Sequence, residues 1–388
     1  MTHAARPIYL DYASTTPVHP AVLQAMEPYL RQEFGNPSNL YRPGRRAAEA
    51  LEAARATVAR TLHCHDDEIV FTSGGSEADN LALKGMTLAR PDKRHLVTTT
   101  IEHSAVLGAA RDLQQHFGVD VTYVPVDASG IVEPAAVAAA VRPDTGLVSV
   151  MLANNEIGTI QPVAEIARLA RARGVPVHTD AVQAAGFLEL DVDRLGVDAL
   201  SLSAHKFYAP KGVGVLYVRR GTPLLPLIHG GSQERGRRAG TENVAGIVGC
   251  GVALELVERH RGATAARLTA LRDRLIAGIE AAVPGVLLNG DHRRRLPGHV
   301  SVCLGDVQGE SLLLELEMDN LYASSGSACH AGSQEPSHVL LAIGRSPELA
   351  HTALRLTLGA PTTDAEIDRV LELLPAAVRR LREMMAAR

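Results

Sequence analysis

The alternation of short β-rich runs with helical stretches constrains the fold of this chain more than any other feature. From about residue 45 to residue 300, runs such as "EIVFTSGG", "HLVTTTIEH" and "VPVHTDAVQ" are separated by segments such as "SEADNLALKGMTLA" and "VAEIARLARARG", whose apolar residues recur at helical spacing. Strands that alternate with helices favour an α/β domain with a mostly parallel sheet. The 388 residues exceed what one hydrophobic core normally organises, so we expect a second, smaller unit.

The pattern changes after about residue 260. A long helical stretch, "AARLTALRDRLIAGIEAAV", leads to shorter strand and helix patterns and then to a C-terminal helix. We therefore predict an α/β fold with two domains. The large domain, with a mostly parallel sheet, is expected over residues 17–259. The smaller α+β domain is expected to combine residues 1–16 with residues 260–388 and to carry a mobile cysteine loop at about 323–337.

The charge and hydropathy of the chain exclude several classes of protein. The formal net charge is −4, which does not favour general binding to nucleic acid or to membrane surfaces. No window approaches the roughly 20 apolar residues of a membrane helix, and the N-terminal residues lack an apolar stretch typical of a signal peptide. We therefore expect a cytoplasmic protein. The basic run Arg293–Arg295 lies between a glycine and a proline and is expected to be a solvated loop.

The four cysteines differ in their surroundings. They are Cys64, Cys250, Cys303 and Cys329, and their wide spacing argues against a disulfide scaffold. Cys250 lies in a small-residue helical pattern and Cys303 in an alternating strand pattern, so both are expected in the core. Cys64 is flanked by two histidines, but no second cluster stands at ligand spacing, so no metal site is predicted. Only Cys329 lies in a run of Ser, Gly and Ala with little to pack against.

Three polar features follow strands of the predicted α/β domain. Lys206 comes just past an apolar strand, Asp180 ends another, and Gly74–Ser76 lies between a strand and a helix. Taken alone, such a lysine is usually solvated, such an aspartate often caps a helix, and the loop matches neither common nucleotide motif. A helix N-terminus nevertheless favours a phosphate, and ligands of open α/β sheets bind at the carboxyl ends of the strands. Together the three features indicate one site with an anion loop, a carboxylate and an amine.

Longer motifs along the chain are similar to those of a known family. They include "IYLDYASTTPVHPAV", "EIVFTSGGSEADNLALKG", "NNEIGTIQPV", "SAHKFYAPKGVGVLYVRR", "HGGSQERGRRAGTENVAGIVG" and "ASSGSACHAGSQEPSHVL", and together they cover nearly the whole chain. The sequence therefore resembles the class V aminotransferase branch of the fold-type I pyridoxal-phosphate (PLP) enzymes. Within that branch it looks like the cysteine desulfurases, in the group with an extended cysteine loop. The resemblance implies a fold-type I PLP-dependent transferase, the cofactor pyridoxal 5'-phosphate and a homodimer.

The resemblance also implies roles around the cofactor. Lys206 would bind it covalently and later remove the Cα proton of the substrate, and Asp180 would keep its pyridine nitrogen protonated. Gln183 would hydrogen-bond the phenolic oxygen, and His103 would stack on the ring and take part in catalysis. Asn155 would contact both the cofactor and the substrate. The phosphate would be held by Gly75, Ser76, Ser203, His205 and, from a second subunit, Thr241.

Two further residues would act on the substrate. Arg355 would fix the carboxylate of L-cysteine together with Asn155, because a guanidinium fork suits a bidentate carboxylate. Taken by itself, Arg355 is typical of a strand residue on an exposed face. Cys329 would attack the substrate sulfur as a thiolate and retain it as a persulfide. His330 follows it where the family usually has a small hydroxyl residue, and whether it tunes the thiol or faces solvent stays open.

The implied activity is that of a cysteine desulfurase, which converts L-cysteine to L-alanine and delivers sulfur from Cys329 to an acceptor protein. The acceptor could serve iron–sulfur cluster assembly or the thiolation of tRNA, DNA or a cofactor, and the sequence does not decide among these. The alternatives are a selenocysteine lyase, another class V lyase or aminotransferase, and a non-enzymatic thiol or metal-binding scaffold built on Cys329, His330 and His338. The "SSGSAC" run favours the desulfurase over an ordinary aminotransferase.

Overall fold

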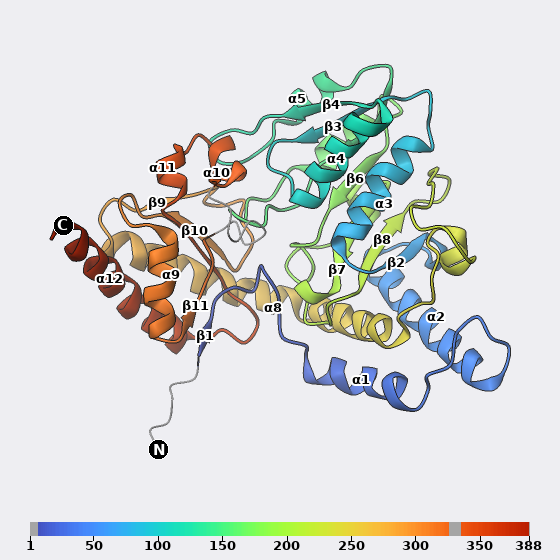
Figure 1. Cartoon of the computed structure of the whole chain (residues 1–388), viewed down its shortest axis with the longest axis horizontal. Coiled ribbons are helices and arrows are strands. Elements are labelled where there is room, and N and C mark those ends of the chain that lie inside the picture. Colours follow the sequence, from blue (N-terminus) through green and yellow to red (C-terminus); the bar gives the residue numbers. More distant parts are fainter. Residues whose placement is uncertain (1–6, 326–334, 388) are drawn as a thin grey trace.

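A seven-stranded sheet forms the centre of the larger part of the molecule in the computed structural model, which describes residues 7–325 and 335–387 (Figure 1). Strand β8 runs antiparallel to both of its neighbours, and the other neighbouring strands are parallel. This confirms the prediction of a large, mostly parallel sheet. In spatial order the strands are β2 (Ile69–Thr72), β8 (Gly214–Val218), β7 (Ala199–Ser203), β6 (Val177–Asp180), β5 (Thr145–Ser149), β3 (His95–Thr99) and β4 (Asp120–Val124).

The sheet is buried on both faces because apolar residues occupy both sides of its strands. In β5, Leu147 and Val148 point to opposite faces, since side chains alternate along a strand, and both are fully buried. Leu147 belongs to one core and Val148 to another, and different helices cover the two. The first core contains α3 (Gly75–Leu88) and α4 (Ser104–Phe117), and the second contains α2 (Arg42–Leu62), α6 (Val163–Arg171) and the start of α8 (Val244–Ala282).

A third core surrounds a small antiparallel sheet in the other part of the molecule. Helices pack on this sheet, and a short parallel strand pair joins the N-terminal segment to it. Its antiparallel strands and its helices agree with the predicted α+β character of this region. The elements are β9 (Leu287–Leu288), β10 (His299–Cys303), β12 (Ala353–Thr357), the pair β1 (Ile8–Tyr9) and β11 (Leu321–Tyr322), α9 (Gly309–Met318) and α12 (Asp364–Ala386).

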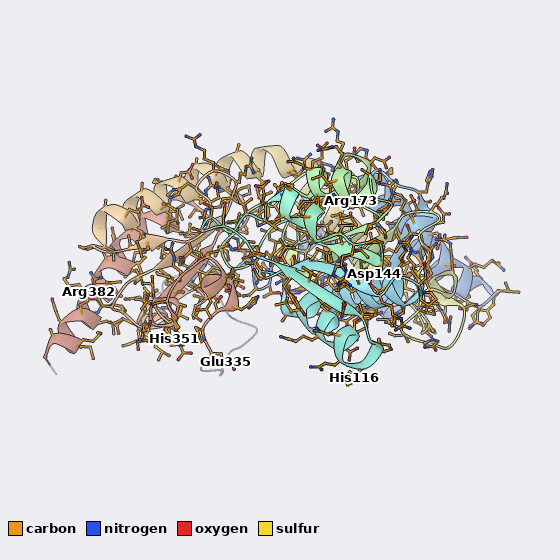
Figure 2. The ribbon with its side chains drawn as sticks, turned by 90° about the horizontal axis from the view of Figure 1, so that it is seen from above. His116, Asp144, Arg173, Glu335, His351 and Arg382 are labelled. Atoms are coloured by element: carbon orange, nitrogen blue, oxygen red, sulfur yellow. The ribbon has the colours of Figure 1, made fainter. Side chains whose placement is uncertain are left out.

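Helix α8 runs along both parts of the molecule (Figure 1). Its residues Ile247 and Leu254 are buried in the core of the large sheet, whereas Leu268 and Leu275 are buried in the core of the small sheet. The same separation is seen in Figure 2, where Arg382 lies in the smaller part and Asp144 in the larger part. A division at residues 259/260 would fall inside this continuous helix, and the domain boundary therefore remains a prediction.

None of the described helices could span a lipid bilayer.

The remaining elements are short helices and 3₁₀ turns. The other elements are α1 (Pro20–Arg31), α5 (Pro134–Ala140), α7 (Val192–Leu195), α10 (His338–Ala342), α11 (Pro347–Ala350) and the 3₁₀ turns Asp66–Glu68, Ala204–Lys206 and Gln233–Gly236.

The structure confirms some expectations about single residues and corrects another. Cys250 and Cys303 are fully buried, as expected for core residues, and Cys64 is partly buried. The expectation of a solvated loop holds for Arg293 but is wrong for Arg295, which is only 3% exposed. The Arg295 guanidinium donates to the carbonyl of Ile157 (2.8 Å), so it fastens one loop to another rather than facing solvent.

Candidate active site

A cavity of about 550 Å³ lies at the carboxyl ends of the central strands, and side chains from both sheets line it. Asp180 is the last residue of β6 and Ser203 the last of β7, whereas Arg355 comes from β12 of the small sheet. The cavity brings together most of the residues predicted for the site. These are Gly75, Ser76, His103, Asn155, Asp180, Gln183, Ser203, His205, Lys206 and Arg355.

Lys206 is partly buried and lines this cavity. It follows β7 in a single 3₁₀ turn, which directs its side chain across the end of the sheet. Its Nζ donates to the backbone carbonyls of Ala13 (2.6 Å) and Ser14 (2.8 Å), and the Gln183 amide donates to the same Ala13 carbonyl (2.9 Å). The surroundings of Lys206 are those of a partly desolvated amine rather than of a solvated surface lysine.

Two buried carboxyl groups form one end of the cavity. Asp180 is 5% exposed and Asp79, from α3, is 1% exposed. Burial raises the pKa of Asp180, and burial together with the nearby Asp180 carboxylate raises the pKa of Asp79 well above its usual value. Oδ1 of Asp79 has no hydrogen-bond partner among the described residues. This end of the cavity therefore favours a hydrogen-bonding ligand that carries a positive charge or a proton.

Histidine side chains near these carboxyl groups are held in defined states. Burial lowers the pKa of His178 to about 3, so its ring is neutral and bonds the hydroxyls of Ser149 and Ser201 (2.9 Å each). The 3.7 Å approach of His178 to Asp79 is therefore not an ion pair. His103 is the N-cap of α4, and its Nδ1 accepts from the amide of Ala105 (3.2 Å). In the neutral ring this places the proton on Nε2.

The N-terminus of α3 forms a second face of the cavity. Its first-turn N–H groups have no acceptor within the helix and favour an anion. A Cβ on Gly75 would come within 2.9 Å of the Val182 side chain and 3.1 Å of Ser203, so only glycine lets the loop approach these strand ends so closely. Burial lowers the pKa of His205 to about 4, which leaves a neutral ring bonded to the Thr15 hydroxyl (3.1 Å). These residues can hold a phosphate.

Arg355 lines the cavity from β12 of the small sheet, and this side is here called the basic end of the cavity. The expectation of an exposed strand residue is wrong, because Arg355 is only 2% exposed. One of its terminal nitrogens, Nη1, donates to the Asn155 carbonyl (2.9 Å), and Nη2 donates to Asp11 Oδ1 and Ser14 Oγ (2.8 Å each). These contacts fix the guanidinium plane, and a fixed guanidinium fork is well suited to a carboxylate.

The sequence reasoning missed several residues that shape the site. The segment Asp11–Thr16 contacts Lys206, His205 and Arg355, although it was assigned only to the smaller domain. Its polar "DYAST" run directly after an apolar strand is the same strand-end signal that identified Asp180. Asp79 could have been suspected because it is an acidic residue at an otherwise apolar position of the α3 pattern.

One predicted residue, Thr241, does not line this cavity, and two others lie outside the described residues. Thr241 is exposed and is not part of the lining. Cys329 and His330 lie outside the described residues, as does most of the predicted loop. The described residues on either side of that stretch do contact the site: Ser324 forms backbone hydrogen bonds with Arg355, and His338 lines the cavity. Glu335, which follows the stretch, is labelled in Figure 2.

One group of side chains has a spacing that a metal ion could use. Ligand atoms of Asp79, His103 and Asp180 lie within 4.8 Å of one another. The raised pKa values of both carboxyl groups oppose this use, because a metal requires ionised carboxylates. Cys64 and its neighbouring histidines do not belong to any such group among the described residues. The sequence prediction of no metal site remains a prediction.

Comparison with known proteins places this chain in a family. The model of the aminotransferase class-V family matches residues 8–370. The chain is 48% identical over 378 residues to the cysteine desulfurase IscS of Dictyoglomus turgidum, which covers 97% of this chain and 96% of that protein. Among solved structures it is similar to a NifS-like protein, with a TM-score of 0.91 at 37% identity, covering 97% of this chain and all of that chain.

A second solved structure, SspA in complex with cysteine, has a TM-score of 0.80 at 38% identity and covers 92% of this chain and all of that chain. These similarities extend over both sheets and the cavity between them. They agree with the mixed α/β fold and with the resemblance drawn from the motifs. The chain therefore belongs to the class-V aminotransferase family and groups within it with the cysteine desulfurases.

Proposed function

We propose that this protein is a PLP-dependent cysteine desulfurase, which converts L-cysteine to L-alanine and keeps the sulfur on Cys329 as a persulfide. The observation that carries the proposal is the convergence of Lys206, Asp180 and Arg355 in one cavity, although they come from separate strand ends on two sheets. The similarity to proteins named cysteine desulfurase supports the same activity.

The residues of the cavity fit pyridoxal phosphate. Lys206 offers an amine for covalent attachment, the α3 N-terminus with Ser203 and His205 suits the phosphate, and Asp180 suits a protonated ring nitrogen. Gly75 lets the helix end approach Val182 and Ser203 closely, which keeps its N–H groups beside the other phosphate residues. When bound, the cofactor supplies an electron sink that stabilises negative charge at the Cα of an amino acid.

The side chains of this chain would bind and orient the amino acid around that cofactor. Arg355 would hold the substrate carboxylate with its fixed guanidinium, and Asn155, whose carbonyl that guanidinium already contacts, would help to place it. Lys206, whose amine lies in the cavity, would remove the Cα proton of the substrate. His103 carries a proton on Nε2 and is a candidate to exchange protons with the substrate or the thiol.

Cys329 would accept the sulfur atom of the substrate and carry it as a persulfide. The Cys329 thiolate attacks the substrate sulfur, a sulfur–sulfur bond forms and the carbon–sulfur bond breaks, with its electron pair left on the carbon fragment. Protonation of that fragment gives alanine, so no external oxidant or reductant is needed. The described cysteines are poor nucleophiles, because burial raises the pKa of Cys64 and Cys250 to about 12 and also raises the pKa of Cys303.

The test measures alanine formed from L-cysteine, with mass spectrometry of the Cys329 peptide for one added sulfur atom. Lys206→Ala should abolish alanine formation and the yellow colour of the bound cofactor. Cys329→Ala should keep the yellow colour but form neither alanine nor the persulfide. Cys64→Ala, a matched cysteine change, should behave as wild type. Wild-type rates of alanine formation by Cys329→Ala would refute the role of Cys329.

We further propose a homodimer in which Thr241 of one subunit contacts the phosphate in the other. Thr241 is exposed and does not line the cavity of its own chain, which supports this arrangement. Mixing the Lys206→Ala and Thr241→Ala variants under exchange conditions should produce hybrid dimers with one intact site. Activity that is no higher than the sum of the separate variants would contradict the shared site.

The persulfide would be delivered to an acceptor protein, and iron–sulfur cluster assembly is the first candidate because relatives carry the name IscS. A selenocysteine lyase or another class V activity is the alternative. Turnover of L-cysteine and L-selenocysteine by the same preparation discriminates between these. A marked preference for selenocysteine, with no persulfide on Cys329, would favour the lyase.

A further inference from the structure

The segment Ser232–Arg238 lies outside the cavity, yet it contacts residues on both sides of the anion loop Gly74–Ser76. Glu234, near its start, and Arg238, at its end, each form an ion pair with a residue from a different helix. Neither residue lines the cavity. Their contacts nevertheless converge on the strand that precedes the loop and on the helix that follows it.

The first contact joins Glu234 to the strand before the loop. Its carboxylate accepts from both terminal nitrogens of Arg55 (2.8 and 2.9 Å) and from the backbone N–H of Phe71 (3.0 Å), which belongs to β2. Both charged side chains are at most 3% exposed. A buried, bidentate ion pair that also binds a strand amide fixes its members in one geometry.

The second contact joins Arg238 to the helix after the loop. Arg238 donates through Nε and Nη2 to the two carboxylate oxygens of Glu77 (2.9 and 3.3 Å), in the first turn of α3. Glu77 also accepts from the backbone N–H of Ser73 (2.8 Å) and so closes the loop. Burial opposes ionisation of Glu77, but the hydrogen bonds from Arg238 and Ser73 outweigh it and lower its pKa.

The backbone between these contacts is strained. Glu234 and Arg235 have φ values of 47° and 57°, in the left-handed region that non-glycine residues rarely adopt. Such conformations persist only where the surrounding contacts impose them. The pair Arg55–Glu234 and the pair Arg238–Glu77 are those contacts, so the segment is held in a shape that reaches both sides of the loop.

From this geometry we infer that Arg238 is a positioning residue for the phosphate group of the cofactor, acting through Glu77. Glu77 shapes the loop through Ser73, but its negative charge stands one residue from Ser76 and would repel a phosphate. The Arg238 guanidinium offsets that charge and keeps the carboxylate turned toward Ser73. The inference rests on the proposed function, because it takes the loop as the phosphate site.

The test compares release of pyridoxal phosphate with release of pyridoxal, which can bind Lys206 but has no phosphate. Holoenzyme carrying Arg238→Ala is dialysed, and its equilibrium dissociation constants for both compounds are measured by absorbance. We expect binding of pyridoxal phosphate to weaken by about tenfold or more, and binding of pyridoxal to change by less than about twofold. Arg369→Ala, which removes an exposed ion pair with Glu372, is the matched control and should change neither.

The double variant Arg238→Ala/Glu77→Gln separates charge from structure. Glutamine keeps an acceptor for the Ser73 amide without the negative charge, so it should restore pyridoxal phosphate binding to within about threefold of wild type. Equal losses for both compounds, no loss for either, or no rescue in the double variant would overturn the inference. If the wild-type protein itself binds no pyridoxal phosphate, the proposed function fails with it, and that result is seen before any variant is compared.

Discussion

The two ends of the cavity bury charged groups to the same degree but balance them in different ways. Asp180 and Arg355 are 5% and 2% exposed. Around Arg355, three contacts supply acceptors that match the guanidinium: a carboxylate, a hydroxyl and a carbonyl. Around Asp180, the Val182 amide and the charges of His103 and Lys206 favour the ionised carboxylate, but burial outweighs them and raises its pKa, so the protein balances this negative charge only in part.

The different charge balance of the two ends determines which ligand groups each end can bind. A guanidinium stays charged when buried and therefore needs permanent acceptors. A buried carboxyl group can instead take up a proton and stay neutral. It becomes ionised when a bound ligand supplies the compensating positive charge. The acid end thus suits the protonated ring nitrogen of the proposed cofactor, and the fixed basic end suits the carboxylate of the proposed substrate. Substitutions at four positions test whether the two ends differ in this way.

The largest effect is expected at the acid end. Asp180→Asn keeps the size of the side chain but cannot hold a positive charge on a ring nitrogen, so the electron sink is weakened. We expect kcat for alanine formation to fall by about 100- to 1,000-fold while the cofactor remains bound. Steady-state kinetics and the absorbance spectrum of the variant measure both. A loss smaller than fivefold would mean that the charge of Asp180 does not matter.

Arg355 should show a different kinetic signature. Arg355→Ala removes the hydrogen bonds to the substrate carboxylate, which contribute about 2–3 kcal/mol. We therefore expect KM for L-cysteine to rise by roughly 30- to 150-fold. Arg355→Lys keeps the charge but loses the fork and the contacts with Asp11 and Asn155, so it should recover only part of this loss. Full recovery in the lysine variant would show that charge alone is needed at this end.

The neutral His178 predicts a pH dependence of stability. Its pKa of about 3 in the folded protein lies below the ordinary value of about 6.5, so between these values the unfolded chain binds more protons. The free energy of unfolding should therefore fall as the pH drops from about 6.5 toward 4, by up to about 1.4 kcal/mol per pH unit from this residue. Denaturant titrations of wild type and His178→Gln check this, and identical slopes in this range would contradict it.

Asp79 should show the smallest effect, although it is as buried as Asp180. Its raised pKa means that the folded state retains a proton that the unfolded state loses above about pH 4, so stability falls as the pH rises above that value. Asp79→Asn imitates the protonated form and removes this cost. We expect kcat to change by less than about threefold and Tm to stay equal or rise. A large loss of kcat would instead mean that Asp79 is ionised and shares the role of Asp180.

Much of the site could be predicted from the sequence because its residues follow regular signals. Asp180, Ser203 and Lys206 end or directly follow apolar strands, and Gly75 and Ser76 open a helix after a strand, so their convergence follows from the topology of a parallel sheet. The role of Arg355 came only from the resemblance, since one strand pattern cannot tell which face is covered. Contacts such as Asp11 with Arg355 join residues 344 positions apart, and no local pattern encodes them.

The parallel α/β architecture, the polar residues at the strand ends and the family could be read from the sequence, because periodicity and long motifs are local properties of the chain. How the charged groups are balanced became visible only in the folded structure. Distant elements exclude water from charged groups and supply their partners. They therefore determine the protonation of Asp79, the burial of Arg295 and Arg355, and the contacts of Arg238 beside the anion loop. Burial and pairing in space set the energies of charged groups, and neither can be read from neighbouring residues in the sequence.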